Sequence, residues 1–375
     1  MLLLHKNDVV ADVLMVSGSI INVNKLYNKE LLPVGTYNDY KNLLANQLSQ
    51  WMKTRAIPSE RQNISQILSA LNQPISDALM KSFAVSLTDC YWIKNGNSKA
   101  QWENVNYYKN GFSDDFVPII YDGLVKINDY RLPDLTTDGV LKKAWVSLSG
   151  VPTLLKTGKL GPNANDKHLL SANEVVAYQV ANLMGIDHVE YYPIRVENSV
   201  ICATPCFIQN DKDEFVSALQ IMKEDKSFRT KLYDNFVNRG LKADVDKMIL
   251  FDHILHNTDR HERNFGIIRD SDTLDTVSFA PLFDSGSCLG WNHTDRISKS
   301  TKPFSEDREE QLSLIGKIPE IPSEKMIIEL INDVYELYDI PENVFEIAKT
   351  EVKNSYEMLK KRDMCQYIEG FEEER

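Results

Sequence analysis

"HNTDRHERNFG", residues 256–266, places Asp259 five residues before Asn264, directly after the apolar run "MILFDHIL" (248–255). The apolar run predicts a buried helix. Such a helix would deliver both polar side chains into the loop that follows it. The sequence therefore predicts a polar loop with a carboxylate and an amide at fixed spacing.

A second polar stretch, "APLFDSGS" (280–287), contains Asp284 two residues before a glycine that permits a sharp turn. Two short strand candidates, 265–268 and 277–283, flank the turn-rich segment "RDSDTLDT". They predict a hairpin, which would bring Asn264, at the start of one strand, beside Asp284, at the end of the other.

These side chains suit phosphoryl transfer. Asn264 and Asp284 offer oxygen ligands for Mg²⁺, which is typically held by one or two carboxylates together with phosphate oxygens. Asp259 could orient an attacking hydroxyl and accept its proton. Protein kinases divide the work in this way among a catalytic Asp, an Asn five residues later and an Asp before a Gly.

A kinase also needs a strand lysine for the ATP phosphates and a helical glutamate that pairs with it. The strand-like "TLLKTGK" supplies Lys156, whose ammonium would be costly to bury without a partner. Glu174 lies in "SANEVVAYQVANLMG" (171–185), which predicts an amphipathic helix. Ser171 and Glu174 have the spacing of a capping box, and Gly185 is a natural stop. We therefore expect a Lys156–Glu174 ion pair.

A phosphate-covering turn should precede the lysine. "TTDGVLKKAW" (136–145) offers the single Gly139, preceded by the hydroxyls of Thr136 and Thr137. A single glycine is a weaker signal than a G-x-G-x-x-G loop. We nevertheless predict that Gly139 contacts the phosphates of ATP.

In this order, the Gly139 turn, Lys156, Glu174, "NTDRHERN" and "PLFDSGS" resemble the HipA-like serine/threonine kinases of bacteria over roughly residues 135–305. The resemblance implies ATP and Mg²⁺ as cofactors, with Asp259 as the catalytic Asp, Asn264 and Asp284 as metal ligands, and Lys156 paired with Glu174. It also implies a hinge that holds adenine, formed by Cys206, Phe207 and Ile208.

The sequence departs from the family pattern at two places and leaves the autophosphorylated residue open. Arg263 replaces the usual lysine before the asparagine. Several hydroxyls are candidates for autophosphorylation in the phosphate loop, namely Thr136, Thr137, Ser147 and Ser149. Residues 1–128 do not read clearly as the usual N-terminal module of the HipA toxin.

The predicted fold class is α+β, a two-lobed protein-kinase-like fold preceded by a mixed N-terminal module. We expect an α/β module over 1–128, a small β-rich lobe with one helix over 129–210 and a mainly helical lobe over 211–375. Within the module, residues 8–27 predict a hairpin or meander, and residues 41–55 and 62–85 predict helices.

Composition limits the classes of partner. The net charge is −12, from 54 acidic and 42 basic residues, which argues against broad attraction to nucleic acid. The five cysteines are few for so long a chain, which favours buried thiols in a reducing, cytoplasmic compartment. No signal peptide or membrane span is recognisable. The resemblance to the HipA-like kinases implies a protein substrate and an antitoxin-like partner that is encoded separately.

Other interpretations stay open. One alternative is a lipid or small-molecule kinase on the same core, and another is a catalytically silent kinase fold that acts as a binding or regulatory protein. Arg260 could be solvated or could neutralise a phosphate. His253, His256 and His261 invite a zinc interpretation, which we do not favour because a third ligand at fixed geometry is not evident. The hydroxyl-rich segment after Gly286 predicts an activation segment or a polar surface loop.

Overall fold

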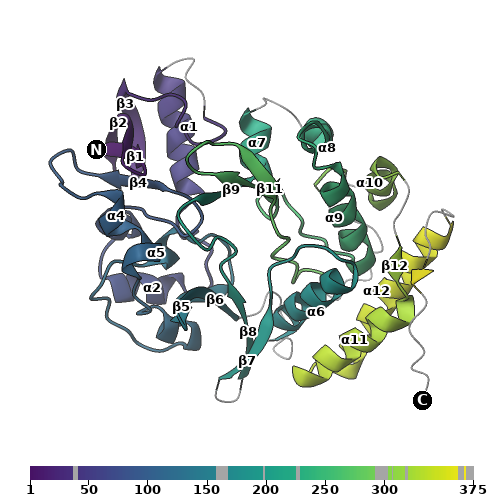
Figure 1. Ribbon diagram of the computed structural model, residues 1–375. Helices are drawn as coiled ribbons and strands as arrows, with labels where there is room; N and C mark the ends of the chain where they lie inside the picture. Colours follow the sequence, from purple (N-terminus) through teal and green to yellow (C-terminus); the bar gives the residue numbers. More distant parts are fainter. Residues whose placement is uncertain are drawn as a thin grey trace. The chain divides into compact units, whose positions relative to one another are not determined.

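The chain forms two compact units, described here one at a time (Figure 1). The first unit comprises Met1–Lys156, Pro205–Lys226 and Ile267–Val277, and the second comprises Thr157–Thr204, Ser227–Gly266 and Ser278–Arg375. The computed structural model describes residues 1–36, 41–157, 168–196, 199–224, 229–291, 303–305, 307–316, 320–361 and 367–368. Most of the hydroxyl-rich segment, including Thr294, Ser298, Ser300 and Thr301, lies outside these residues. The division into three predicted parts stays a prediction.

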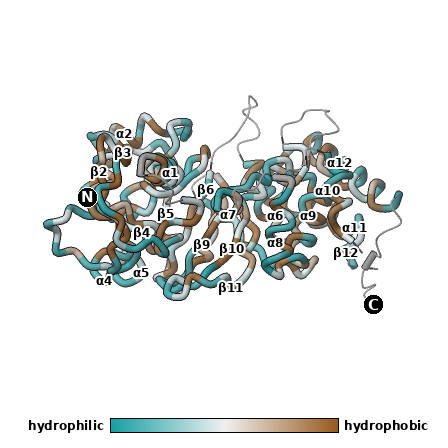
Figure 2. Tube along the Cα trace, turned by 90° about the horizontal axis from the view of Figure 1, so that it is seen from above, coloured by the Kyte–Doolittle hydropathy of each residue, from teal (hydrophilic) through white to brown (hydrophobic). Residues whose placement is uncertain are grey.

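The N-terminal residues of the first unit form a four-stranded antiparallel sheet in the order β3-β2-β1-β4. Its strands are β1 (Leu2–His5), β2 (Asp8–Val16), β3 (Ser19–Leu26) and β4 (Tyr91–Lys94). Ser17 and Gly18 both have positive φ and make the tight β2–β3 turn, so the predicted meander is confirmed. Helix α1 (Lys41–Lys53) packs on β3, and apolar residues of these elements are brown in Figure 2.

The helix predicted over 62–85 is two helices, α2 (Ile64–Leu71) and α3 (Ile75–Lys81). The break has a local cause. The backbone of Asn72 is left-handed after α2, and the backbone of Pro74 is extended before α3. Proline has no N–H to donate and clashes with the preceding turn, so it cannot continue a helix. Further short elements of this unit are α4 (Trp102–Val105), α5 (Tyr107–Asn110), η1 (Val117–Tyr121), η2 (Pro133–Thr136) and α7 (Ala218–Glu224).

The strand predicted to contain Lys156 and the two strands of the predicted hairpin are present. β5 (Lys142–Leu148) and β6 (Val151–Thr157) are neighbours, joined by Ser149 and Gly150 with positive φ. A three-stranded sheet has the order β11-β10-β9, with strands β9 (Asp213–Ser217), β10 (Gly266–Asp270) and β11 (Thr276–Phe279). The predicted hairpin of β10 and β11 is therefore confirmed.

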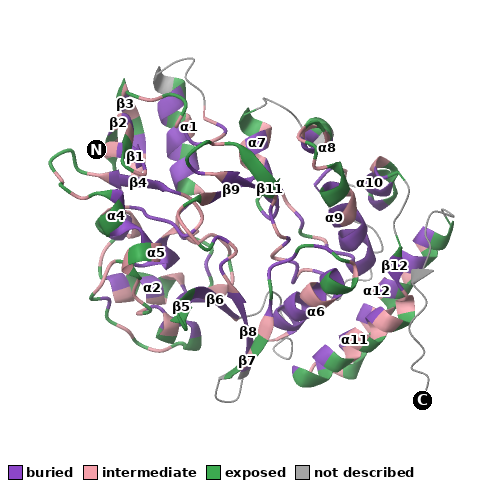
Figure 3. Cartoon of the chain, viewed as in Figure 1, coloured by how far each residue is buried: buried purple, intermediate pink, exposed green. Residues whose placement is uncertain are grey.

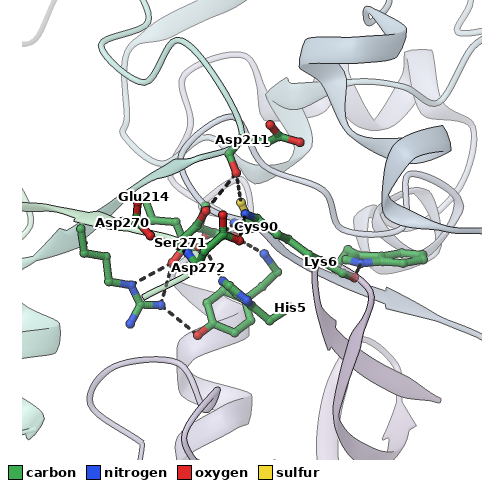
Figure 4. Close-up of polar contacts among 12 residues, drawn as sticks. His5, Lys6, Cys90, Asp211, Glu214, Asp270, Ser271 and Asp272 are labelled. Carbon is green, nitrogen blue, oxygen red and sulfur yellow. Dashed lines mark hydrogen bonds and ion pairs between the residues drawn. The ribbon is translucent and has the colours of Figure 1, made fainter. Parts of the chain in front are cut away.

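A buried polar cluster ties the N-terminal sheet to β9 and β10 within the first unit (Figure 4). Glu214 accepts hydrogen bonds from the Cys90 amide at 2.7 Å and the Arg269 Nε at 2.8 Å, and its Oε1 lies 2.8 Å from His5 Nε2. Arg269 also donates to the Tyr91 hydroxyl at 3.0 Å. Residues near the N-terminus are therefore part of the same packed unit as β10.

This cluster predicts loss of stability in acid. Burial alone would raise the pKa of Glu214, but the hydrogen bond from His5 and the charge of Arg269 lower it from 4.5 to about 2. The ionised carboxylate of Glu214 therefore stabilises the folded protein. This stabilisation is complete above about pH 4.5 and is lost as the pH falls toward about 2. It amounts to on the order of 3 kcal/mol. We expect Glu214→Gln to be less stable at neutral pH and to lose this pH dependence in urea unfolding.

The exposed Glu30→Gln is the matched control and should follow the wild-type curve. If the free energy of unfolding of Glu214→Gln fell in acid as steeply as that of the wild type, the assignment of this pH dependence to Glu214 would be contradicted.

The second unit is mainly helical. Its elements are α6 (Leu169–Leu183), β7 (Tyr192–Val196), β8 (Ser199–Pro205), α8 (Arg229–Asn238), α9 (Lys242–Leu255), α10 (Arg308–Leu314), β12 (Ile321–Pro322), α11 (Glu324–Leu337), α12 (Glu342–Lys361) and β13 (Tyr367–Ile368). β7 and β8 form an antiparallel pair. Helix α6 packs against α11, and α9 packs against α8, α10 and α12.

Two details of these helices bear on the site. The predicted capping box is wrong, because α6 begins at Leu169 and Ser171 is a buried residue of its first turn. Gly185 does follow the helix with a positive φ, as predicted. The second half of α9 is buried, as Figure 3 shows in purple, because this helix is surrounded by others. Among the helices that the structure describes, none is both long and apolar enough to cross a membrane.

Candidate active site

The loop that carries Asp259 and Asn264 starts where α9 ends. His256 takes a left-handed conformation (φ 48°), and its amide donates to the carbonyl of His253 at 3.2 Å, which closes the helix. Two tight turns follow, in which the His261 amide donates to Asp259 O and the Asn264 amide donates to His261 O, both at 2.8 Å. The turns leave the side chain of Asp259 exposed and bury Asn264.

Side chains inside the loop fix its shape. The Asn264 Nδ2 donates to the carbonyl of Asp259 at 3.3 Å, so the amide nitrogen is used within the loop and the amide oxygen is the atom left to act as a ligand. The Asp259 amide donates to Asn257 Oδ1, and Asn257 Nδ2 donates to Asp252 Oδ1 at 2.9 Å. The loop is therefore anchored to α9 through Asp252.

Arg260 joins this loop to the segment that contains Asp284. Its Nη1 donates to the carbonyls of Asn264 at 2.9 Å and Phe283 at 2.6 Å, and its Nη2 donates to Ser285 Oγ at 2.9 Å. Its Nε lies 3.0 Å from Asp252 Oδ2 in an ion pair, and its side chain is 0% exposed. Arg260 is therefore neither solvated nor available to a phosphate, the two possibilities left open by the sequence.

Burial alone would lower the pKa of Arg260, but the charge of Asp252 and its hydrogen bonds raise that pKa, so the guanidinium stays charged. Sequence reasoning missed this contact. The available signal was Asp252 itself, a carboxylate in the middle of an apolar helix, because a buried charge requires a partner.

The Asp284 segment is held in an unusual backbone conformation. Asp284 has a φ of 56°, which is costly for a residue other than glycine and persists only when its surroundings enforce it. On its N-terminal side, Leu282 exchanges backbone hydrogen bonds with Asp187 and Val189 at 2.9 and 2.8 Å. The Asp284 amide donates to the Tyr191 hydroxyl at 3.3 Å.

Helix α6 lies directly against the same segment. The carboxylate of Glu174 accepts a hydrogen bond from the Ser285 amide at 2.9 Å. Gly286 follows, and a Cβ at this position would lie 2.8 Å from the carbonyl oxygen of Leu170. Only glycine therefore allows this close approach of the segment to α6.

The residues predicted to contact ATP at its phosphates lie in the first unit. Lys156 is buried near the end of β6, whereas Glu174 belongs to the second unit, so their ion pair stays a prediction. Gly139 has a φ of 99°, and its amide donates to Asp138 Oδ1 at 2.7 Å. Lys143 Nζ donates to the Asp138 carbonyl at 2.8 Å, which closes a compact turn.

The predicted hinge is also in the first unit. The Cys206 amide donates to the carbonyl of Pro152 at 2.8 Å, and the Ile208 carbonyl accepts a hydrogen bond from the Tyr108 hydroxyl at 2.9 Å. The carbonyl of Cys206 accepts one from the side chain of Gln209. These protein contacts use several of the backbone groups of the hinge, and Phe207 lies between them.

The histidines of this region have partners inside the protein. His256 Nδ1 lies 2.6 Å from a carboxylate oxygen of Glu351, and His253 Nε2 lies 3.3 Å from the carbonyl of Ser355. The His261 ring accepts a hydrogen bond from the Arg263 amide at 3.3 Å. Within the described part of the chain, no three His, Cys, Asp or Glu side chains are grouped as a metal site.

The chain is similar to known proteins over the segment that carries the candidate site. The family described as "HipA-like C-terminal domain" matches residues 135–336, which is more than half of the chain. The chain belongs to this HipA-like family. The matched range contains every candidate site residue named above, from Gly139 to Asp284.

A curated relative is the serine/threonine-protein kinase CtkA of Helicobacter pylori (strain J99 / ATCC 700824), 31% identical over 130 residues. That alignment covers 31% of this chain and 40% of the relative, so it spans less than half of the relative's length. The crystal structure of the H. pylori proinflammatory kinase CtkA matches 58% of this chain and 91% of that chain, at 18% identity and a TM-score of 0.42.

A second similar structure is that of HipA from Shewanella oneidensis MR-1, solved with HipB and operator DNA. The match covers 95% of this chain and 96% of the HipA chain. The TM-score is 0.51 at 12% identity, which establishes a common fold. The predicted α+β, HipA-like fold class and the family resemblance are therefore confirmed.

Proposed function

We propose that this chain is a serine/threonine protein kinase of the HipA-like type, which transfers the γ-phosphate of ATP to a protein hydroxyl. The observation that carries the proposal is the hydrogen bonding of one buried guanidinium, that of Arg260, to both predicted catalytic segments. It bonds to Asn264 in the loop and to Phe283 and Ser285 beside Asp284. The family membership and the kinase relative support the same reaction.

Asp259 is proposed to act as the catalytic base. Its carboxylate is exposed, so a substrate hydroxyl can reach it, while its backbone is held by Asn257 and Asn264. A carboxylate in a rigid loop can orient the attacking hydroxyl and accept its proton. The rigid backbone limits the positions that this hydroxyl can take.

Asn264 and Asp284 are proposed to hold Mg²⁺. An amide oxygen and a carboxylate are hard donors that suit this ion, and the Asn264 amide nitrogen is already bonded to Asp259 O. When bound, Mg²⁺ would neutralise charge on the ATP phosphates. The strained φ of Asp284 supports a functional role for that residue.

Residues of the first unit are proposed to bind the nucleotide. Lys156 would hold the phosphates with Glu174 as its partner, and Gly139 would let the turn backbone approach them. The segment Cys206–Ile208 would contact adenine.

The partners are proposed from the relatives. HipA of S. oneidensis was solved in complex with HipB and operator DNA, which supports a separately encoded antitoxin-like partner here. The substrate is proposed to be a protein that offers a serine or threonine, and autophosphorylation is expected. No membrane or direct nucleic-acid partner is proposed.

The test is the intact mass of the protein before and after incubation with Mg-ATP, for the wild type and for Asp284→Asn. We expect a phosphate-sized increment in the wild type only, because the variant loses a metal ligand. Fragment masses would locate the modified serine or threonine. Peptide arrays incubated with labelled ATP would detect a kinase that modifies only external substrates.

A wild type that is unmodified as purified, gains no phosphate and labels no peptide would overturn the proposal. Binding of ATP without any transfer would then favour a catalytically silent binding protein.

A further inference from the structure

Asn173 is a fully buried amide that binds the Asp284 segment. It precedes Glu174 in α6 and is 0% exposed. Its Nδ2 donates to the carbonyls of Gly286 and Cys288, each at 3.0 Å. Asn173 therefore donates both amide hydrogens to carbonyls of one short segment, residues 286–288.

The remaining polar atom of this amide is also bonded. Asn173 Oδ1 accepts a hydrogen bond from the hydroxyl of Tyr335 at 2.7 Å. Tyr335 lies in α11, is 2% exposed, and belongs to the helix that packs against α6. Burial raises the pKa of Tyr335 well above its usual value, so its hydroxyl stays protonated and remains a donor.

The segment needs support on its C-terminal side. Asp284 has a positive φ, and such a conformation is unfavourable for a residue other than glycine unless neighbouring contacts impose it. Arg260 and Tyr191 hold the residues at and before Asp284, and Glu174 holds the Ser285 amide. Asn173 holds the carbonyls that come next, so the turn is bound on both sides of Asp284.

We propose that Asn173 and Tyr335 are positioning residues, which hold the Asp284 segment in the conformation that binds Mg²⁺. This inference rests on the proposed function, because it assigns these residues a part in the same metal site.

The tyrosine hydroxyl has a specific task in this arrangement. An asparagine amide can rotate by half a turn, which exchanges its oxygen and its nitrogen. Rotation of Asn173 would turn its oxygen toward the carbonyls of Gly286 and Cys288, where it would repel them. The two carbonyls only accept and therefore face the nitrogen, and the hydroxyl of Tyr335 provides the donor that the buried oxygen needs in this orientation.

The experiment uses Tyr335→Phe in the full chain. Asn173→Leu would remove three hydrogen bonds from a buried position and would test folding as much as metal binding. Tyr335→Phe removes one hydroxyl and keeps the ring. Tyr356→Phe is the matched control, because the hydroxyl of Tyr356 is also buried and donates to the carbonyl of Pro322 at 2.6 Å. Pro322 directly precedes Ser323, the N-cap residue of α11.

The readout is the affinity for the non-hydrolysable ATP analogue AMP-PNP, measured in EDTA and in Mg²⁺. The gain in affinity caused by Mg²⁺ reports the metal site independently of turnover. We expect Tyr335→Phe to reduce this gain about fivefold, the equivalent of one neutral hydrogen bond, and to leave the affinity in EDTA unchanged. Tyr356→Phe should keep the wild-type gain, although both variants lose a similar amount of thermal stability.

The outcomes separate the two proposals. A wild type that gains no nucleotide affinity from Mg²⁺ would overturn the proposed function and this inference with it. A wild type with a normal gain, together with an unchanged gain in Tyr335→Phe, would overturn the inference alone. Equal reductions in Tyr335→Phe and Tyr356→Phe would also overturn it, because the effect would then be one of general stability.

Discussion

Replacing Asp259 by asparagine is expected to lower phosphoryl transfer about a thousandfold while leaving the affinity for ATP near that of the wild type. Asparagine matches the shape of aspartate but cannot accept a proton from the attacking hydroxyl. The hydrogen bonds that Asn257 and Asn264 make to the backbone of Asp259 do not use its carboxylate, so they should persist. Transfer is measured with radiolabelled ATP, and binding is measured by calorimetry.

Asp284→Asn separates the two roles. We expect it to weaken binding of Mg-ATP as well as transfer, because the variant loses the charged metal ligand. Asp275→Asn makes the same chemical change at an exposed position of the β10–β11 turn and should behave as the wild type. Full transfer activity in Asp259→Asn would rule out the catalytic role of that residue.

Replacing Arg260 by methionine is expected to cost about 3–5 kcal/mol of unfolding free energy. The variant would leave the carboxylate of Asp252 buried without its ion-pair partner. It would also remove the donors to Asn264 O, Phe283 O and Ser285 Oγ. Urea unfolding followed by circular dichroism measures this loss.

Two further variants give this prediction its control. Arg263→Met removes an exposed arginine three residues away and should change the unfolding free energy by less than about 0.5 kcal/mol. Asp252→Asn combined with Arg260→Met removes the buried charge and should recover part of the loss. A double variant no more stable than Arg260→Met would contradict the view that the unpaired carboxylate causes the loss.

Local pattern was sufficient to predict most of the elements that carry the site. The apolar run before Asp259 is the second half of α9, and the two short apolar runs that flank the turn are β10 and β11. The strand that contains Lys156 and the helix that contains Glu174 were also predicted. These predictions held because hydrophobic periodicity and turn residues act over short stretches of chain.

The errors came from positions where local rules compete. Ser171 has the spacing of an N-cap, yet α6 begins two residues earlier, and the serine is buried inside it. Apolar residues recur at helical spacing between 62 and 85, but Asn72 and Pro74 divide this stretch into two helices. The role of Arg260 was missed because its partners, Asp252 and Ser285, lie 8 and 25 residues away in the sequence.

The amino-acid sequence by itself determined the order of the elements, the spacing of Asp259, Asn264 and Asp284, and the HipA-like family to which the chain belongs. Only the tertiary structure decided which groups hold those residues in place. Arg260 and Asn173 both bond to the Asp284 segment, one from the catalytic loop and one from α6. Such contacts join groups that are distant in the chain, and a buried charge or amide is stable only where packing has already brought its partners within hydrogen-bonding distance.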